Sequence, residues 1–290
     1  MSIVAEVPSF LQVLSNGLVK RFEPEISPVS NESSSHGYKS KDVMIDLTKS
    51  ISGRMFLPDT PGSSSHLPVL VYFHGAVASQ TIVLSVDYRL APENRLPIAY
   101  DDCFSSLEWL SNQVSSEPWL ERADLCRVFL SGDSAGGNIA HNVALKVIQE
   151  KTYDHVKIRG LLPVHPYFGS EERTEKEREG EAAGYVAMND LLWKLSLPQG
   201  SNRDYSGCNF ERAAISSAEW GRFPAVVVYV AGLDFLKERG VMYAGFLEKK
   251  GVEVKLVEAE DQSHVYHVYH PQSEATHLLQ KQMSEFIHSF

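Results

Sequence analysis

Cysteine is scarce in this chain of 290 residues, with only three present, at positions 103, 126 and 208. So few and so widely spaced cysteines exclude a disulfide-stabilised secreted framework and provide no pair with metal-ligand spacing. They fit a reducing compartment. The cytosol is therefore the expected location, and the nucleus is the alternative.

Positive charge is in deficit as well, because 27 Lys and Arg residues face 37 Asp and Glu residues, for a formal net charge of −10. An acidic chain is a poor partner for nucleic acid or for an anionic membrane surface. The segment Met1–Phe10 has no basic stretch and no long apolar core. We therefore expect no signal peptide, no transmembrane segment and no membrane partner.

Apolar residues, in contrast, make up 43% of the chain, enough for a sizeable core. The length suits one domain over residues 1–290, with 1–40 and 170–200 expected to form a lid or cap. Period-2 and buried apolar runs predict strands at 43–47, 52–57, 69–73, 82–88, 127–130, 158–164, 225–231 and 252–257. Helical spacing predicts helices at 97–112, 134–148, 238–250 and 273–286.

The order of these elements, strands first and then strand–helix alternation, predicts an α/β fold. Its central sheet should be mostly parallel, with helices on both faces. The segment Glu171–Glu181 is dense in charge and interrupts the alternation. A solvated helix, a mobile loop and part of a cap insertion all fit it.

The most informative motif is G-x-S-x-G at residues 132–136, which reads GDSAG. It lies between the apolar run 127–131 and a helical stretch at 137–149, the strand–turn–helix setting of a nucleophile elbow. Such a turn is too tight for side chains at its flanking positions, and it raises the Ser134 hydroxyl above the sheet. The helix N-terminus beneath it favours a developing oxyanion.

A serine hydroxyl is a weak nucleophile and needs a histidine base, which in turn needs an acid to orient it. In a doubly wound sheet these groups belong at the carboxyl ends of strands. Asp234 follows the strand at 225–231, and His264 follows the strand at 252–257. The order Ser134, Asp234, His264 is that of the α/β-hydrolase fold.

Other interpretations of these residues compete with the triad. Asp234 could cap the following helix, and Asp261 is a nearby carboxylate, although it shares a loop with His264. The spacing His264-x-x-His267-x-x-His270 could suggest a metal site, but no supporting Cys or H-E-x-x-H pattern accompanies it. We expect no metal. We place His267 in the first turn of the last helix or in support of the loop.

Taken together, the motifs resemble those of the plant carboxylesterases in the hormone-sensitive-lipase branch of the α/β-hydrolase fold. The matching segments are LQVLSNG at 11–17, PVLVYFHG at 68–75, VDYRLAPE at 86–93, GDSAGGN at 132–138, HPYFG at 165–169, AGLD at 231–234 and SHVYH at 263–267. They extend over nearly the whole chain. The resemblance implies an esterase for small acyl esters.

Two relatives within this branch give alternatives. The gibberellin receptors replace the catalytic histidine with an aliphatic residue, whereas His264 is present here. The 2-hydroxyisoflavanone dehydratases include members with threonine at the nucleophile position, whereas this chain has Ser134. Both differences favour ester hydrolysis over a ligand-binding paralogue or a lyase.

The chain departs from the family after the His-Gly of the oxyanion motif. That motif normally continues with glycines and opens a loop and helix of about twenty residues or more before the next strand. Here HGAVASQT at 74–81 leads directly to the strand at 82–88, as if a piece had been excised. A splice variant or an incorrect gene model would produce such a gap.

The gap has consequences for the chemistry. Gly75, Ala76 and Ala135 are the candidate oxyanion donors, and the Cβ of Ala76 falls where close backbone approach is needed. Loss of one donor typically lowers the rate by about 10²–10³, so weakened activity is expected.

The gap also bears on the sheet. Parallel neighbours usually need a crossover of about a dozen residues or more. Frayed strand ends, a displaced strand or an unstable hydrolase are therefore the expected outcomes. The missing helix should leave an apolar patch of the sheet exposed and lower the stability.

The resulting hypothesis is a serine carboxylesterase that forms an acyl-enzyme on Ser134, with His264 as general base and Asp234 as its orienting acid. It implies a small-molecule ester substrate and no cofactor. The substrate, its acyl preference and the oligomeric state stay open.

Overall fold

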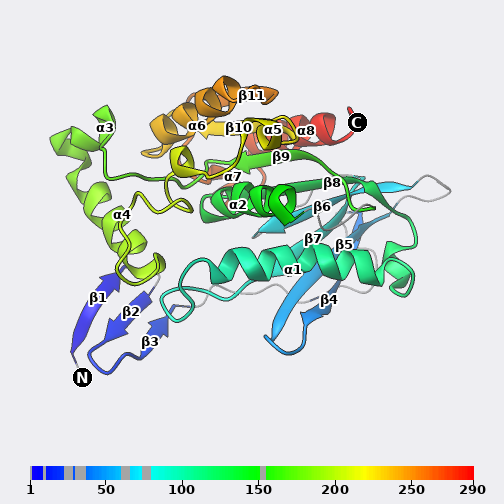
Figure 1. Cartoon of the computed structure of the whole chain (residues 1–290), viewed down its shortest axis with the longest axis horizontal. Helices are drawn as coiled ribbons and strands as arrows, with labels where there is room; N and C mark the ends of the chain where they lie inside the picture. Colours follow the sequence, from blue (N-terminus) through cyan, green and yellow to red (C-terminus); the bar gives the residue numbers. More distant parts are fainter. Residues whose placement is uncertain are drawn as a thin grey trace.

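A computed structural model of the chain describes residues 2–8, 11–22, 29, 37–59, 66–73, 80–150 and 155–290. In this part of the chain the main element is an eight-stranded sheet, in the order β11-β10-β9-β8-β6-β7-β5-β4 (Figure 1). Six neighbouring strands of this sheet run parallel: β11, β10, β9, β8, β6 and β7. The pairs β4–β5 and β5–β7 are antiparallel. The expected mostly parallel sheet is confirmed.

The main-sheet strands are β4 (Tyr38–Asp46), β5 (Ile51–Pro58), β6 (Leu67–Phe73), β7 (Ile82–Asp87), β8 (Ala123–Asp133), β9 (Ile158–Val164), β10 (Ala225–Ala231) and β11 (Val254–Ala259). The helices are α1 (Ile98–Gln113), α2 (Ala135–Glu150), α3 (Glu175–Arg178), α4 (Ala183–Ser196), α5 (Ser217–Trp220), α6 (Lys237–Lys249), α7 (Tyr266–Tyr269) and α8 (Glu274–Ile287). Single 3₁₀ turns lie at Pro118–Leu120, Gly180–Ala182 and Phe210–Arg212. All four sequence-predicted helices are present, with ends shifted by one or two residues, whereas α4 was not predicted. No helix among the described residues is both long and apolar enough to span a bilayer.

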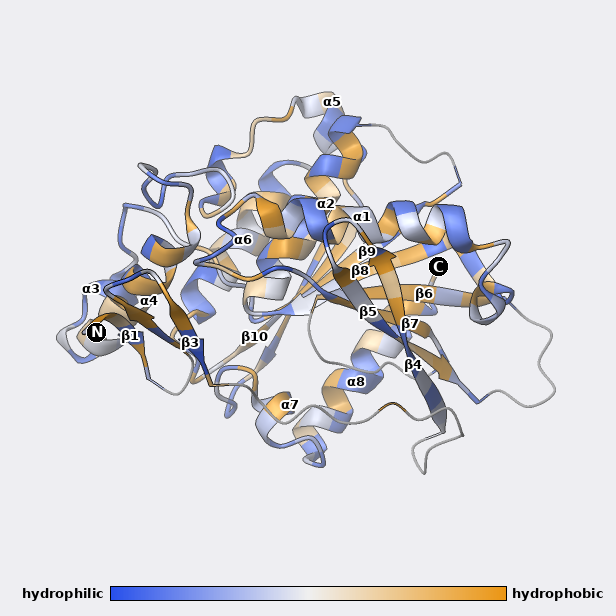
Figure 2. Cartoon of the chain, turned by 90° about the horizontal axis from the view of Figure 1, so that it is seen from below, coloured by the Kyte–Doolittle hydropathy of each residue, from blue (hydrophilic) through white to orange (hydrophobic). Residues whose placement is uncertain are grey.

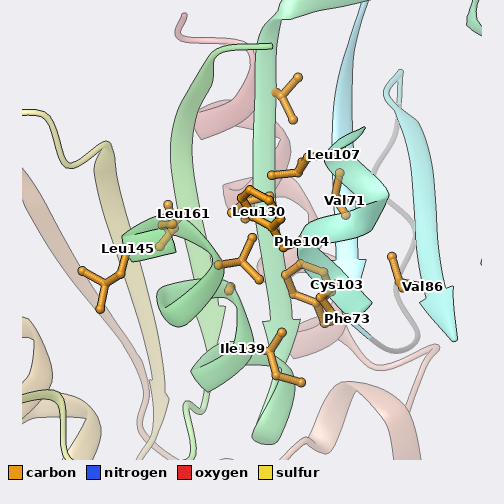
Figure 3. Close-up of a cluster of buried hydrophobic side chains, with 14 of the residues drawn as sticks. Val71, Phe73, Val86, Cys103, Phe104, Leu107, Leu130, Ile139, Leu145 and Leu161 are labelled. Atoms are coloured by element: carbon orange, nitrogen blue, oxygen red, sulfur yellow. The ribbon is translucent and has the colours of Figure 1, made fainter. Parts of the chain in front are cut away.

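Both faces of the sheet are covered, because alternate residues of each strand point to opposite sides. On one face, sheet residues such as Val71 and Leu130 pack in one buried cluster with Leu107 of α1 and Ile139 of α2 (Figure 3). On the other face, the intervening residues pack with α7 and α8; they include Leu70, Tyr72, Val83, Phe129, Leu279 and Met283. Figure 2 shows α1 and α2 above the sheet and α7 and α8 below it.

The short link between β6 and β7 leaves both strands in place. They pair in parallel, with Val69 opposite Ile82 and Tyr72 opposite Ser85. The expectation of frayed ends or a displaced strand is therefore wrong. The chain has to return by about 13 Å along the strand direction, and the eight residues 74–81 can span up to about 28 Å.

The expected exposed apolar patch on these strands is also wrong. Leu70, Tyr72 and Val83 are fully buried. They face the side that α8 covers and belong to its cluster. These side chains of β6 and β7 are thus buried despite the short link between the strands.

A small second sheet at the N-terminus was not predicted from the sequence. Strands β1 (Ile3–Val7), β2 (Leu11–Leu14) and β3 (Val19–Arg21) form it in that order, antiparallel. It lies beside α4, which β1 contacts (Figure 1). The two regions expected to form a cap, 1–40 and 170–200, therefore meet in space.

The charge-dense segment 171–181 contains a short anchored helix, α3. Thr174 and Glu177 form a capping box at its start. Arg239 of α6 donates to both carboxylate oxygens of Glu177, at 2.9 and 2.8 Å. Glu238 of α6 accepts from the backbone N–H of Lys176 at 2.9 Å. A loop is the wrong interpretation of residues 175–178, because they are helical and three charged side chains, Glu177, Glu238 and Arg239, hold them against α6.

Candidate active site

The elbow at Ser134 has the geometry that its glycines predict. Ser134 stands between β8 and α2 with φ of 54°, in the left-handed region. A Cβ added to Gly132 would lie 2.5 Å from the carbonyl carbon of Gly136, and one added to Gly136 would lie 2.1 Å from the carbonyl oxygen of Phe73. Only glycine fits at either position, so the turn can approach β6 closely and present the serine side chain.

The structure brings Ser134, His264 and Asp234 together. His264 Nε2 lies 3.0 Å from Ser134 Oγ, and His264 Nδ1 lies 2.7 Å from Asp234 Oδ2. These are hydrogen-bond distances for a nucleophile, a base and an orienting acid. The Asp234 carboxylate is buried, whereas the His264 side chain is about one-third exposed, at 34%. The predicted chain of three groups is thus present as a connected array.

Asp234 also bonds to the residue that directly precedes α6. Its Oδ1 accepts a hydrogen bond from the backbone N–H of Leu236 at 2.9 Å, while Oδ2 pairs with His264. The N-cap residue of α6 is Leu236, and the helix has no side-chain cap hydrogen bond, so the capping interpretation is not confirmed. The Oδ2 contact fits the orienting interpretation, which stays a prediction. Using both oxygens restrains the carboxylate more than either bond alone.

The loops that carry Asp234 and His264 are joined to each other. Leu233 N–H donates to the carbonyl of Gln262 at 2.9 Å, and Gly232 N–H donates to the carbonyl of Ala259 at 2.9 Å. A Cβ on Gly232 would lie 1.8 Å from the carbonyl oxygen of Glu260. A glycine here lets the two loops pack at backbone distance, which fixes the acid relative to the base.

The competing residues take other positions. Asp261 is exposed, and the Nδ1 of His264 pairs with Asp234. His267 lies in α7, a separate turn before the last helix, so its placement in the first turn of that helix was wrong. His270 ends α7 with φ of −128°, as expected for a residue before a proline.

His165 is a component of this region that the sequence reasoning did not single out. It follows β9, is 2% exposed, and its Nδ1 accepts a hydrogen bond from the backbone N–H of Val265 at 2.9 Å. Burial lowers its pKa to about 3. The sequence signal that could have identified it is its position directly after a buried strand, at the start of HPYFG.

Asp133, next to Ser134, is a second group with a shifted pKa, and it is half-buried. Burial raises its pKa to about 6, although Tyr72 donates a hydrogen bond to it at 3.1 Å and the positive form of His264 would lower the pKa. Asp133 thus holds a proton more readily than an ordinary aspartate.

Ala135, one of the three candidate oxyanion donors, is the exposed first residue of α2. Its backbone N–H therefore has no acceptor within the helix. The other two, Gly75 and Ala76, lie outside the described residues.

Among the residues that the structure describes, the one group with metal-ligand proximity is His165, Asp234 and His264, whose ligand atoms lie within 4.8 Å of one another. Asp234 and His264 already share a hydrogen bond, and His165 Nδ1 already accepts one. The spacing of His264, His267 and His270 forms no such group there.

A sequence model of the alpha/beta hydrolase fold family matches residues 70–268, which is more than half of the chain. The chain belongs to the α/β-hydrolase fold family. The matched range contains all three residues of the array.

Several plant proteins are similar to this α/β-hydrolase. Probable carboxylesterase 1 of Arabidopsis thaliana is 32% identical, with 95% of this chain and 94% of that protein covered. A gibberellin receptor of the same plant is 33% identical over 84% of this chain and 70% of its own length. A 2-hydroxyisoflavanone dehydratase of Glycyrrhiza echinata is 31% identical, covering 97% and 95%. The family resemblance read from the motifs is confirmed.

Among solved structures, a thermostable esterase from Pseudomonas putida has the same fold. Its TM-score is 0.73 at 24% sequence identity, and the match covers 88% of this chain and 83% of that one. At this identity the likeness supports the fold.

Proposed function

We propose that this α/β-hydrolase is a serine carboxylesterase for small acyl esters. The observation that carries the proposal is the hydrogen-bonded array in which His264 bridges Ser134 at 3.0 Å and Asp234 at 2.7 Å. The similarity to a probable carboxylesterase over 95% of the chain supports the same reaction class.

In the proposed reaction, Ser134 Oγ attacks the ester carbonyl while His264 Nε2 takes its proton. Asp234 holds Nδ1–H of the imidazole and stabilises the positive charge that forms. The tetrahedral oxyanion accepts from Ala135 N–H and from the amides of Gly75 and Ala76. His264 then protonates the leaving alcohol. Water, activated by the same base, hydrolyses the acyl-enzyme and releases the acid.

The chemistry needs no cofactor or metal, because nucleophile, base and acid are all side chains of this chain. We propose that the substrate enters beneath a lid formed by the N-terminal sheet and the region of α3 and α4. The cytosolic location stays a prediction.

A second candidate is a ligand-binding paralogue with little catalysis. It is favoured by the similarity to a gibberellin receptor and by alanine at position 76, where the family has glycine. A lyase related to the dehydratases is a third candidate, and a hydroxyisoflavanone assay tests it.

A fluorophosphonate probe, which reacts with activated serines, separates the esterase from the binding protein. We expect the wild-type protein to be labelled and Ser134→Ala to be unlabelled. Circular dichroism confirms that both are folded. Folded wild-type protein without labelling would favour the ligand-binding candidate.

Hydrolysis of p-nitrophenyl butyrate tests the effect of the shortened oxyanion loop. We expect turnover about 10²–10³ below that of an ordinary esterase, corresponding to one lost oxyanion donor. Turnover at ordinary esterase rates would show that the remaining donors suffice.

A further inference from the structure

His165 lies directly behind the base of the array, although it touches neither Ser134 nor Asp234 by any hydrogen bond in the described structure. Its ring centroid is 5.8 Å from that of His264, and its side chain is almost fully buried at the end of β9. Its Nδ1 accepts a hydrogen bond from the backbone N–H of Val265. The contact therefore reaches the residue that follows His264.

The acceptor role fixes the chemical form of His165. A neutral imidazole has one donor and one acceptor nitrogen, so acceptance at Nδ1 places the ring proton on Nε2. Burial lowers the pKa of this histidine to about 3. The ring therefore remains a neutral acceptor at any pH at which an esterase base would work.

The residue that donates this hydrogen bond, Val265, has an unusual backbone conformation. Its φ is +46°, and a left-handed conformation is a genuine outlier for a β-branched residue. His165 itself has φ of +47°. Such conformations persist where the surroundings over-determine them, and they cluster at functional sites. The Val265 N–H bond joins the two strained residues to each other.

We propose that His165 is a positioning residue that holds the backbone of Val265, and through it holds His264 in reach of both Ser134 and Asp234. This inference rests on the proposed esterase function. A purely structural alternative exists, because the His165 ring also packs against Tyr266 and His267, at centroid distances of 5.6 and 5.9 Å. The two roles differ in whether an acceptor atom is required.

Three variants separate these roles. His165→Leu removes the acceptor but keeps an apolar side chain in the core. His165→Asn keeps an acceptor, because its Oδ1 is as many bonds from Cα as the Nδ1 of histidine. His267→Leu is the matched control, since it removes a neighbouring imidazole that is 8% exposed and whose ring nitrogens have no hydrogen-bond partner among the described residues.

The measurements are the rate of fluorophosphonate labelling, kcat and KM for p-nitrophenyl butyrate, and the NMR resonance of the His264 Nδ1 proton. We expect His165→Leu to label and turn over about 10–100-fold more slowly, with little change in KM and with loss of the proton resonance. His165→Asn should recover to within about threefold of the wild type and keep the resonance. His267→Leu should also stay within about threefold.

Wild-type rates in folded His165→Leu would overturn the proposal, as would His165→Asn being as slow as His165→Leu. If His165→Leu does not fold, the His264 resonance in His165→Asn decides: its retention supports the proposal and its loss overturns it. The nitrogen–nitrogen coupling across Val265 N–H and His165 Nδ1 in wild-type protein tests the bond itself, and its absence also overturns the proposal. Unreactive wild-type protein would refute the esterase function, while the NMR measurements would still test His165.

Discussion

At the scale of single residues, backbone strain collects around the array. Ser134, His165 and Val265 all have positive φ, between 46° and 54°. Each such conformation costs about 1–3 kcal/mol and is maintained only by its surroundings. The hydrogen bonds and close glycine contacts described above provide those surroundings.

The orienting role of Asp234 gives a first prediction. Asp234→Asn should lower kcat by about 10⁴, because an amide favours the wrong histidine tautomer and removes the charge that stabilises the imidazolium. Steady-state hydrolysis of p-nitrophenyl butyrate measures this. Asp261→Asn, an exposed carboxylate three residues before His264, is the control and should keep wild-type kcat. Equal losses in both variants would contradict the assignment of the acid.

The close approach of the elbow to β6 gives a second prediction. Gly136→Ala places a Cβ 2.1 Å from a backbone oxygen, which cannot move without shifting β6. We expect a loss of about 1–3 kcal/mol or more in the free energy of unfolding, measured by urea denaturation. Gly245→Ala in the interior of α6 meets no atom within 4 Å and should gain about 0.5–1 kcal/mol. A tolerated Gly136→Ala would show that the elbow can relax.

At the scale of elements, α6 connects Asp234 to the charge-dense segment that contains α3. It begins just after Asp234, and its first turns carry Glu238 and Arg239, which hold α3. Arg239 is 4% exposed and also donates to Ser170 Oγ and to the carbonyl of Glu172. One helix thus begins three residues after Asp234 and holds the charge-dense segment through its first turns.

The anchor gives a third prediction. Arg239→Met leaves the carboxylate of Glu177 without its buried partner, and breaking a buried pair in this way typically costs about 3–5 kcal/mol. We expect faster amide hydrogen exchange in residues 170–182 and a raised KM, with a smaller effect on kcat. Arg178→Met, an exposed arginine of α3, is the control and should leave exchange unchanged. Unaltered exchange in Arg239→Met would show that α3 is held by other contacts.

At the scale of the whole molecule, buried neutral histidines make the fold sensitive to acid. Burial lowers the pKa of His141 to about 3, of His165 to about 3 and of His267 to about 4. In the unfolded chain each would titrate near 6.5. The folded pKa is depressed, so the stability they contribute is complete above pH 6.5 and is lost as pH falls toward 4. Asp133 has the opposite effect on stability. Its pKa is raised in the folded protein, so its protonation favours folding at low pH.

The fourth prediction follows from this balance. Between pH 6.5 and 4.5 the free energy of unfolding should fall as pH falls, by at most about 1.4 kcal/mol per pH unit for each net proton taken up on unfolding. Urea denaturation across this range measures the slope. His267→Leu removes one such proton and should reduce the slope of the unfolding free energy against pH by up to about 1.4 kcal/mol per pH unit. His277→Gln, at an exposed site, is the control and should leave the slope unchanged. A stability independent of pH in this window would contradict the buried neutral state.

Much of the site could be predicted because its signals are local. GDSAG specifies a tight turn, and a loop residue that follows a buried parallel strand must lie at one edge of the sheet, which placed Asp234 and His264 correctly. The N-terminal strands escaped prediction because they are short and stabilised by pairing with each other. His165 escaped it because its partner is a backbone N–H that lies 100 residues further along the chain.

The sequence by itself determined the fold class, the family and the order of Ser134, Asp234 and His264 along the chain, because periodicity and turn chemistry act over a few residues. Only the tertiary structure decided that β6 and β7 remain neighbours despite the short link, since that depends on distances between strand ends. It alone also showed that α3 is bonded to α6 and that His165 accepts a hydrogen bond from Val265, because those contacts join segments whose approach is set by packing.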